Sequence, residues 1–427
     1  MLRTPATVHR RRGTVAVLVA LCLIGLFGVV AIALDGGMLL DRRRHVQATA
    51  DAAALAAATQ LYQRYPTLRG TDDGTARQAA FDYAAANGYP NDGVTANVTV
   101  NIPPQSGPFA NQLGHVEVII EYLQPRAFSA IWDSEDVPVR ARAVARGMWE
   151  VSRNGIMVLD LTQKAALNAH GGGTIVVNGA PVIVNSNDPE AAAVANGTNV
   201  IITAPDFYIV GGYSTTGGAQ FIGNIHTGER AAPDPLRYLP PPDPNTLPTR
   251  YKDTNVINHS GGLKQYILSP GRYVGGLSFS SKDSVIMEPG IYYMDGGGFS
   301  WSGQSGTSLT AEGVMIYNAP TGNSQKVSIS GQGTVKLTAP TSGTYQGIAI
   351  FQDRNANVDV NITGNGAFDI RGTLYAANAF MKVAGNGDVS LGSQHISRML
   401  DVGGNGGFTI TWDPTLAPRV RIITLVE

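Results

Sequence analysis

A chain of 427 residues, 43% hydrophobic and 15% charged, can bury substantial cores and is long enough for two or three domains. Lysine and arginine (31) balance aspartate and glutamate (32) to a net charge of -1, so the composition predicts no nucleic-acid partner. The single cysteine, Cys22, excludes an intramolecular disulfide and a cysteine-based zinc site.

The first predicted element is a membrane-spanning helix. Residues 15–34 carry no charge, and at ~1.5 Å per residue they match the ~30 Å hydrocarbon core of a bilayer. Arg10, Arg11 and Arg12 precede this run, although a second arginine group at 42–44 follows it. The positive-inside rule therefore makes residues 1–14 a basic cytoplasmic tail and places the bulk of the chain on the other side.

A cleaved signal peptide is the alternative, because Ala31-Ile32-Ala33 has the small-x-small pattern that precedes a cleavage point. The apolar run, however, exceeds the ~7–15 residues usual in a signal peptide, and helix-forming residues continue beyond Leu34. We therefore expect the span to be retained.

Residues 35–150 form the next predicted domain, which has an α+β pattern. Helix formers without proline continue to Gln63, and a short second helix covers residues 76–87. Alternating apolar residues then predict three strands, at 94–102, 116–123 and 137–151. In the last strand, Arg140, Arg142 and Arg146 are predicted to form one solvated face, with an anionic binding patch as the alternative.

The N-terminal region also resembles a known family. The relevant residues are Gly13 before the apolar run, Leu34-Asp35-Gly36 at its end, the arginine group, Gln47, and the segment 51–56 (DAAALA). This pattern is similar to the N-terminal domain of the Tad (Flp) pilus-assembly TadE/TadG-like family. The resemblance implies a single-pass protein of the bacterial inner membrane with its bulk periplasmic or extracellular, acting with pilus-assembly or envelope proteins.

The same resemblance identifies one candidate processing residue. Some small members of the family are cut after a glycine that has a glutamate five residues later. Gly13 could be that glycine, but Leu18 stands at the glutamate position. The resemblance thus gives only a weak basis for cleavage after Gly13.

Residues 151–427 show an internal repeat. The segments 362–370, 383–391 and 402–410 share a Gly-Asn-Gly core, and Gly364, Gly385 and Gly404 are spaced by 21 and 19 residues. This period predicts a right-handed parallel β-helix, a solenoid in which flanking apolar residues point inwards and Asn365, Asn386 and Asn405 stack at one corner. A β-sandwich of antiparallel hairpins is the alternative fold.

Residues 228–253 interrupt the repeat with many prolines, which cannot join a β-ladder. They are predicted to form an extended loop that crosses one face of the solenoid. A proline-rich docking peptide is the alternative.

The sequence contains no recognisable catalytic or metal-binding motif. Its acidic residues in the repeat region are scattered singly, whereas glycoside hydrolysis needs two carboxylates ~5–9.5 Å apart. No histidine pair has helical metal-site spacing. The segment 403–407 (GGNGG) begins like a calcium-binding repeat, but Phe408 stands where that repeat needs aspartate. We therefore expect no enzyme activity, no cofactor and no metal site.

The predicted function is that of a membrane-anchored structural component of Tad/Flp-type pilus assembly or cell-surface attachment. One alternative is a cell-surface carbohydrate-binding adhesin, whose partners would be surface glycans. The other is a polysaccharide-processing β-helix enzyme.

Overall fold

The computed structural model describes residues 12–131, 135–190, 192–386 and 389–427. The chain divides into two compact units. Unit 1 contains the residues up to Trp149 together with Arg421–Glu427, and unit 2 contains Glu150–Val420. The sequence had placed 421–427 with the repeat region, and the structure corrects this boundary.

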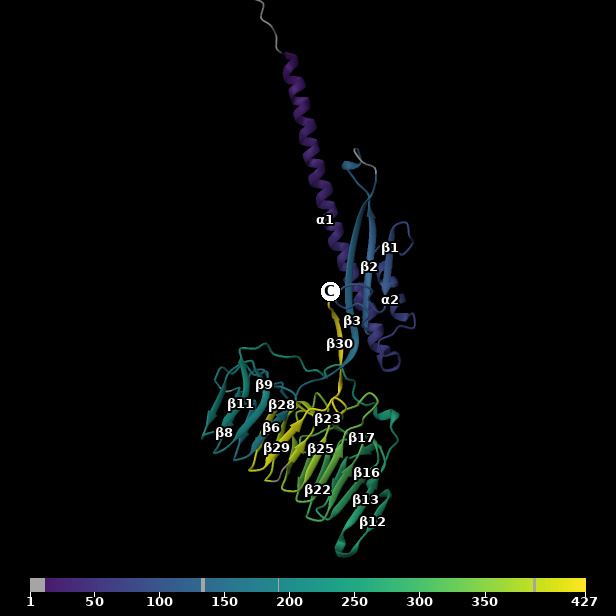
Figure 1. Ribbon diagram of the computed structural model, residues 1–427. Coiled ribbons are helices and arrows are strands. Elements are labelled where there is room, and N and C mark those ends of the chain that lie inside the picture. The colour runs from purple at the N-terminus through teal and green to yellow at the C-terminus, as the bar shows by residue number, and fades with distance from the viewer. Residues whose placement is uncertain (1–11, 132–134, 191, 387–388) are drawn as a thin grey trace, which may run out of the picture. The chain divides into compact units, whose positions relative to one another are not determined.

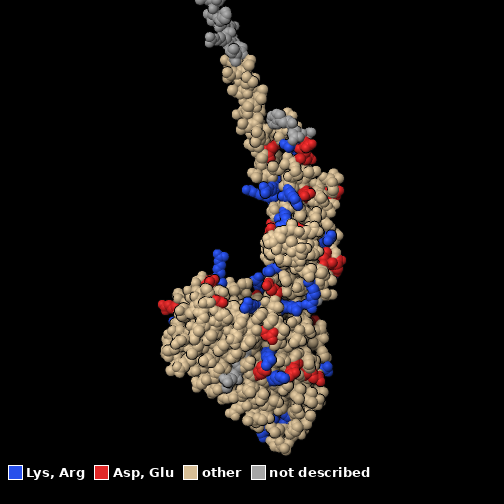
Figure 2. All heavy atoms as spheres, in the orientation of Figure 1, with Lys and Arg blue, Asp and Glu red and all other residues tan. Residues whose placement is uncertain are grey.

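Unit 1 begins with one continuous helix, α1 (Arg12–Leu68). Its first half is apolar and exposed, with Val15 at 64% and Phe27 at 66% of full exposure. Figure 2 shows no charged atoms on the visible face of this part of the helix. Within the described residues it is the one helix that is long and apolar enough to span a membrane, as the sequence predicted.

The second half of α1 packs on a sheet through alanine. Ala50, Ala53, Ala54, Ala57 and Ala58 are fully buried, as are alanines of the second helix, α2 (Thr75–Ala86). Small side chains let the helix approach closely: a Cβ at Gly147 would lie 1.8 Å from the carbonyl oxygen of Ala58. Glycine at this position is therefore required by packing.

The sheet has the order β1-β2-β3-β30. The first three strands are antiparallel neighbours and lie where the sequence predicted them: β1 (Ala96–Asn101), β2 (His115–Gln124) and β3 (Val137–Val151). A single 3-10 turn, η1 (Ser129–Ile131), lies between β2 and β3. The last strand, β30 (Arg419–Leu425), pairs beside β3, and Val144 exchanges backbone hydrogen bonds with Val426 and Glu427. This pairing explains why the end of the chain belongs to unit 1.

Unit 2 is a sheet of 26 strands. Three-strand groups recur along it, with bounds β4 (Ile156–Val158), β5 (Leu167–His170), β6 (Thr174–Asn178), β7 (Val182–Val184), β8 (Ala193–Asn196), β9 (Ile201–Ile209), β10 (Tyr213–Thr216), β11 (Gln220–Thr227), β12 (Val256–Asn258), β13 (Lys264–Leu268), β14 (Gly271–Val274), β15 (Leu277–Phe279), β16 (Asp283–Met287), β17 (Gly290–Asp295), β18 (Phe299–Gly303), β19 (Ser308–Ala311), β20 (Val314–Ala319), β21 (Val327–Gly331), β22 (Thr334–Thr338), β23 (Ile348–Gln352), β24 (Val360–Gly364), β25 (Phe368–Arg371), β26 (Thr373–Ala384), β27 (Val389–Leu391), β28 (Gln394–Gly403) and β29 (Gly407–Thr411).

The pairing in this sheet is parallel. From β13 to β22, each strand pairs with the strand three positions further along the chain. Among the described pairs, β12–β13 is the one antiparallel exception. The result disagrees with the alternative of stacked antiparallel hairpins.

The strands do not follow one another in simple chain order. The chain enters the sheet at β4, adds strands outwards to β11, crosses to the far end at β13, and returns until β28 pairs with β4 and β5 and β29 pairs with β6. Figure 1 shows the consequence: teal strands lie at one end, green strands at the other, and yellow strands between them. The sequence repeat gave no indication of this internal seam.

Apolar residues stack inside the sheet in register. Along one ladder the inward positions are Phe299, Val327, Val360, Met381, Leu400, Leu167 and Ala193. Phe408 and Ile410 are also buried, as predicted. The predicted asparagine stack is present, because the amide oxygen of Asn365 accepts from the backbone N–H of Asn386, and that of Asn386 accepts from Asn405. The neighbouring Gly387 and Asp388 lie outside the described residues.

The proline-rich insert lies against one face of this sheet. Asn185 exchanges two hydrogen bonds with the backbone of Ala232, and the Tyr345 hydroxyl donates to the carbonyl of Pro240. Further on, Arg272 exchanges backbone bonds with Pro248 and Arg250. The 3-10 turn η2 (Pro244–Thr246) lies among the prolines, η3 (Lys252–Thr254) follows them, and η4 (Ser260–Gly262) follows β12. We call residues 228–253 the strap.

Candidate functional site

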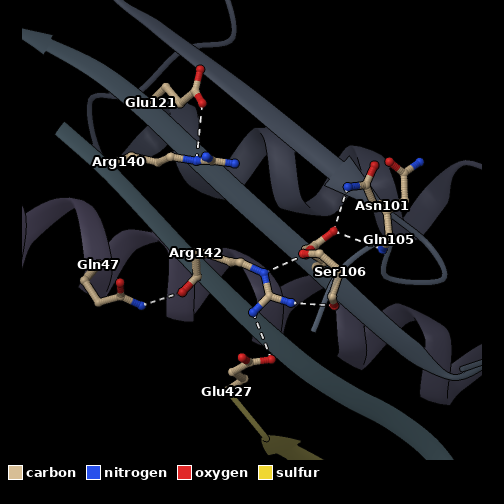
Figure 3. A network of polar contacts seen from close by, with 9 residues as sticks. Gln47, Asn101, Gln105, Ser106, Glu121, Arg140, Arg142 and Glu427 are labelled. Carbon is tan, nitrogen blue, oxygen red and sulfur yellow. Dashed lines mark hydrogen bonds and ion pairs between the residues drawn. The ribbon is translucent and has the colours of Figure 1, made fainter. Parts of the chain in front are cut away.

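A buried carboxylate on β2 is the centre of a polar network in unit 1. Glu117 has no exposed surface. Its two oxygens accept hydrogen bonds from the Asn101 amide (2.7 Å), the Gln105 backbone N–H (3.1 Å), the Ser106 hydroxyl (2.5 Å) and the Arg142 guanidinium (2.6 Å). Figure 3 shows these donors converging from the end of β1, from the loop after it and from β3. The loop and the two strands are thereby tied to one point.

This environment fixes the charge of Glu117. Burial raises the pKa of a carboxylate, but the hydrogen bonds from Ser106, Asn101 and Arg142 outweigh burial and bring the pKa of Glu117 down to about 2. The side chain is therefore ionised throughout the physiological pH range. A group held in this state is suited to stabilising structure rather than to exchanging protons.

Arg142 extends the network to two more elements. Its guanidinium forms an ion pair with Glu427 at 2.8 Å, and its backbone carbonyl accepts from the Gln47 amide of α1 at 2.9 Å. Burial lowers the pKa of Arg142, while the bonds to Glu427 and Glu117 raise it, and the net change is upward. Figure 3 shows this side chain between β2 and the end of the chain.

The predicted solvated arginine face is therefore wrong for Arg142, whose side chain is only 23% exposed. The prediction failed because β30 and the loop after β1 cover that part of β3. Arg140 is exposed and forms an outer ion pair with Glu121, its direct neighbour across the strands. In the sequence, the network is indicated by glutamates at alternating positions of β2 and arginines at alternating positions of β3. Their pairing can be predicted only when the register of the two strands is known.

Two residues that carried the family resemblance have structural roles in unit 1. The Gln47 amide bridges Asp51 on the same helix and β3, so it fixes the helix to the sheet. The carboxylate of Asp35 accepts hydrogen bonds from the backbone N–H groups of Phe128 (3.0 Å) and Ser129 (2.7 Å) in the β2–β3 connection. Gly13, the candidate processing residue, lies in the first turn of α1.

The acidic residues of unit 2 each have their own partners. Asp295 pairs with Arg272, Asp359 with Lys326, and Asp369 with Arg371. The remaining described members of the set are Asp283, which accepts from the backbone of Ser280, Glu288, which accepts from Ser269, Asp353, which accepts from Tyr317, and Asp401, which contacts Asn168 and His170. Some of these contacts join neighbouring strands, whereas Asp369–Arg371 lies within β25 and Asp283–Ser280 within a turn, and none of them gives two of these carboxylates a shared partner.

Among the described residues, no group of three or more histidine, cysteine, aspartate or glutamate side chains could hold a metal ion. A shallow groove of about 590 Å³ does run across the outer face of β22, β25, β27 and β29. Polar side chains line it, including Lys336, Asp369, Ser390 and Thr409, which are successive partners in the parallel pairing. Chemically, this arrangement can donate and accept hydrogen bonds along a line.

Comparison with known proteins gives one informative match. Residues 13–60 match the family described as "Putative Flp pilus-assembly TadE/G-like", which confirms the predicted resemblance for this segment. No curated protein matches the chain. The crystal structure of the competence-associated pilin ComZ from Thermus thermophilus aligns over 74% of this chain and 81% of its own, with 12% identity and a TM-score of 0.31. A score this low supports no inference about fold or function.

Proposed function

We propose that this protein is a membrane-anchored, non-catalytic structural component of Tad/Flp-type pilus assembly or cell-surface attachment. The observation that carries the proposal is the family match over residues 13–60. This segment includes both the exposed apolar half of α1 and the alanine-rich half that packs on the sheet. The match therefore covers both the apolar part of α1 and the part that attaches α1 to the sheet.

The proposed location is the bacterial inner membrane, with a cytoplasmic N terminus and the bulk periplasmic or extracellular. The uncharged run and the arginines before it support this orientation. A periplasmic reporter enzyme fused after Glu427 should be active, whereas the same reporter should be inactive before residue 10. The reverse result would overturn the orientation.

We further propose that unit 2 winds as a parallel β-helix that serves as a scaffold. The parallel pairing at a three-strand interval and the stacked inward residues support this architecture. A scaffold of this kind presents long flat faces to partners. The separate pairing of its acidic residues favours that role over polysaccharide cleavage.

The test of the pilus role is co-purification from native membranes. The full chain should bring down the pilus-assembly ATPase and platform proteins, and deletion of its gene should abolish pili seen by electron microscopy. Restoring the wild-type gene should restore pili. A normal piliation level in the deletion strain, together with no co-purifying assembly protein, would overturn the proposal.

The groove on unit 2 favours a second candidate function, binding of surface glycans. Aligned polar side chains on a shallow face suit an extended saccharide, which offers hydroxyl groups at regular intervals. Glycan-array binding by the wild type that is lost in Lys336→Ala, without release of shorter products, would favour this adhesin function. Product release would favour the enzyme instead.

A further inference from the structure

The connection between β2 and β3 runs along α1 towards the end of the apolar segment. The Arg42 guanidinium donates to the side chain of Gln124, the last residue of β2, at 2.9 Å. Further along the connection, Phe128 and Ser129 donate to Asp35. Arg42 lies seven residues after Asp35, which is about 10 Å along a helix. The connection therefore climbs about that distance towards the apolar segment.

The contact at Asp35 sets the level of this connection. Asp35 directly follows Leu34, the last residue of the uncharged run. The polar layer on each side of a bilayer core is about 5–8 Å thick. A segment whose backbone is bonded to Asp35 must then lie at that layer if α1 spans the membrane.

Two side chains at this level, those of Phe128 and Ile131, are apolar and exposed, whereas the Arg126 guanidinium donates to the backbone carbonyl of Glu135. Phe128 is 48% exposed and Ile131 is 83% exposed, and neither side chain belongs to the hydrophobic core of unit 1. Between the connection and α1 lies a cleft of about 250 Å³, which is lined by Ile32, Met38, Leu39, Pro125 and Val137 among others. Such a surface is unfavourable in water and favourable at a lipid interface.

Charge on the adjacent helix fits the same surroundings. Arg43 and Arg44 are exposed and lie about 13–15 Å beyond Leu34 along the helix, near enough to the headgroups for long side chains to reach back towards them. Anionic lipid headgroups attract such residues. The apolar residues therefore lie on the membrane side of the basic ones, in the order that a bilayer surface requires.

We propose that residues 125–131 form a second membrane contact, in which Phe128 and Ile131 insert into the outer interfacial layer of the lipid beside α1. The proposal rests on the proposed membrane span. The contact would hold unit 1 at a fixed height and rotation relative to the bilayer, because a helix alone leaves rotation about its axis free.

The experiment is spin labelling of the full chain in nanodiscs of phosphatidylethanolamine and phosphatidylglycerol. A Cys22→Ala background removes the native thiol, and single cysteines replace Ile131, Leu113 and Phe27. Leu113 is the matched control, since it is 51% exposed and precedes β2 at its opposite end. Phe27 reports on the span itself. Power saturation then measures how often each label collides with oxygen, which dissolves in lipid, and with a nickel complex, which stays in water. A high ratio of oxygen to nickel collisions indicates a label in lipid.

We expect the oxygen-to-nickel collision ratio at residue 131 to exceed that at residue 113 several-fold and to fall below that at residue 27. Equal ratios at 131 and 113, with a high ratio at 27, would overturn the second contact while leaving the anchor intact. A low ratio at 27 would overturn the membrane span, and the second contact with it.

Discussion

Glycine at one corner of unit 2 is required by contact between neighbouring strands. A Cβ at Gly385 would lie 2.1 Å from the carbonyl oxygen of Gly364, and one at Gly404 would lie 2.0 Å from that of Gly385. The same close approach recurs at further glycines of this corner: Gly331, Gly364, Gly171 and Gly197. The stack continues across the seam, because Gly171 lies against Gly404.

Gly385→Ala should therefore destabilise unit 2 by about 1–3 kcal/mol, because the added methyl group overlaps a backbone atom that cannot move without its strand. The free energy of unfolding of unit 2 can be measured by denaturant unfolding of the full chain in detergent. The matched control is Gly322→Ala, whose Cβ would meet only a side-chain nitrogen of Gln325 at 3.8 Å. Equal stability of the two variants would contradict the stack.

Glu117 gives the stability of unit 1 a predictable pH dependence. Its pKa falls from an ordinary 4.5 to about 2 in the folded protein. The stabilisation of unit 1 by the ionised Glu117 side chain is then fully present above pH 4.5. It is lost through protonation as the pH falls through 4.5 towards 2. At ~1.4 kcal/mol per pKa unit, the loss amounts to about 3 kcal/mol.

Glu117→Gln should remove this dependence, so the difference in unfolding free energy from the wild type should be largest at pH 7 and shrink below pH 4.5. Trp149 fluorescence reports unit 1, because its indole donates to the Tyr62 carbonyl. Glu121→Gln, at an exposed ion pair, is the control and should change little. A pH-independent difference for Glu117→Gln would show that charge is not the cause.

At the scale of elements, one arginine fastens the middle of the strap. Arg354 donates to the carbonyls of Leu236 and Leu239 and to the Tyr375 hydroxyl, which in turn donates to Asp234. Leu236 is buried against a cluster that includes Tyr317, Phe351, Tyr375 and Ile396. The strap is thus packed into unit 2. This packing favours the extended loop over the docking peptide that the sequence left as the alternative.

Arg354→Ala should loosen the strap, because two part-buried carbonyls and a hydroxyl lose their donor. Trypsin should then cleave the strap several-fold faster at Arg230, Arg237 or Arg250, as followed by mass spectrometry of fragments. Arg371→Ala removes an exposed arginine paired with Asp369 and should leave cleavage unchanged. Unchanged cleavage in Arg354→Ala would mean that the apolar contacts and the hydrogen bonds from Asn185 and Tyr345 are enough to hold the strap.

For the whole molecule, the return of the chain to unit 1 is the main organising feature. β30 occupies the edge of the sheet beside β3, and Ile423 packs against the unit 1 core. The chain therefore leaves unit 1 once, builds all of unit 2 and ends in unit 1. The stability of unit 1 depends on residues about 270 positions beyond the end of β3.

Deleting residues 421–427 should destabilise unit 1 by on the order of 2 kcal/mol, since β3 loses its edge partner and Arg142 loses Glu427. Calorimetry of the full chain should show a lower unfolding temperature for unit 1 and an unchanged unfolding temperature for unit 2. Glu427→Gln should give a smaller decrease of the same transition. If deletion leaves both transitions in place, β30 is dispensable.

The sequence by itself determined the elements whose cause is local. An uncharged run of the right length makes the apolar half of α1, alternation makes β1 to β3, and the glycine-asparagine period makes parallel strands with their asparagines in line. These features depend on neighbouring residues or on a short period, so they can be read from a single segment.

Only the tertiary structure decided which distant segments meet. The pairing of β28 with β4, the position of β30 and the burial of Glu117 and Arg142 each depend on contacts between residues far apart in the chain. Backbone hydrogen bonds can form between any two strands, so local sequence does not select the partner. The selection comes from which apolar faces and charges fit together once all the strands are present, and that information belongs to the whole fold.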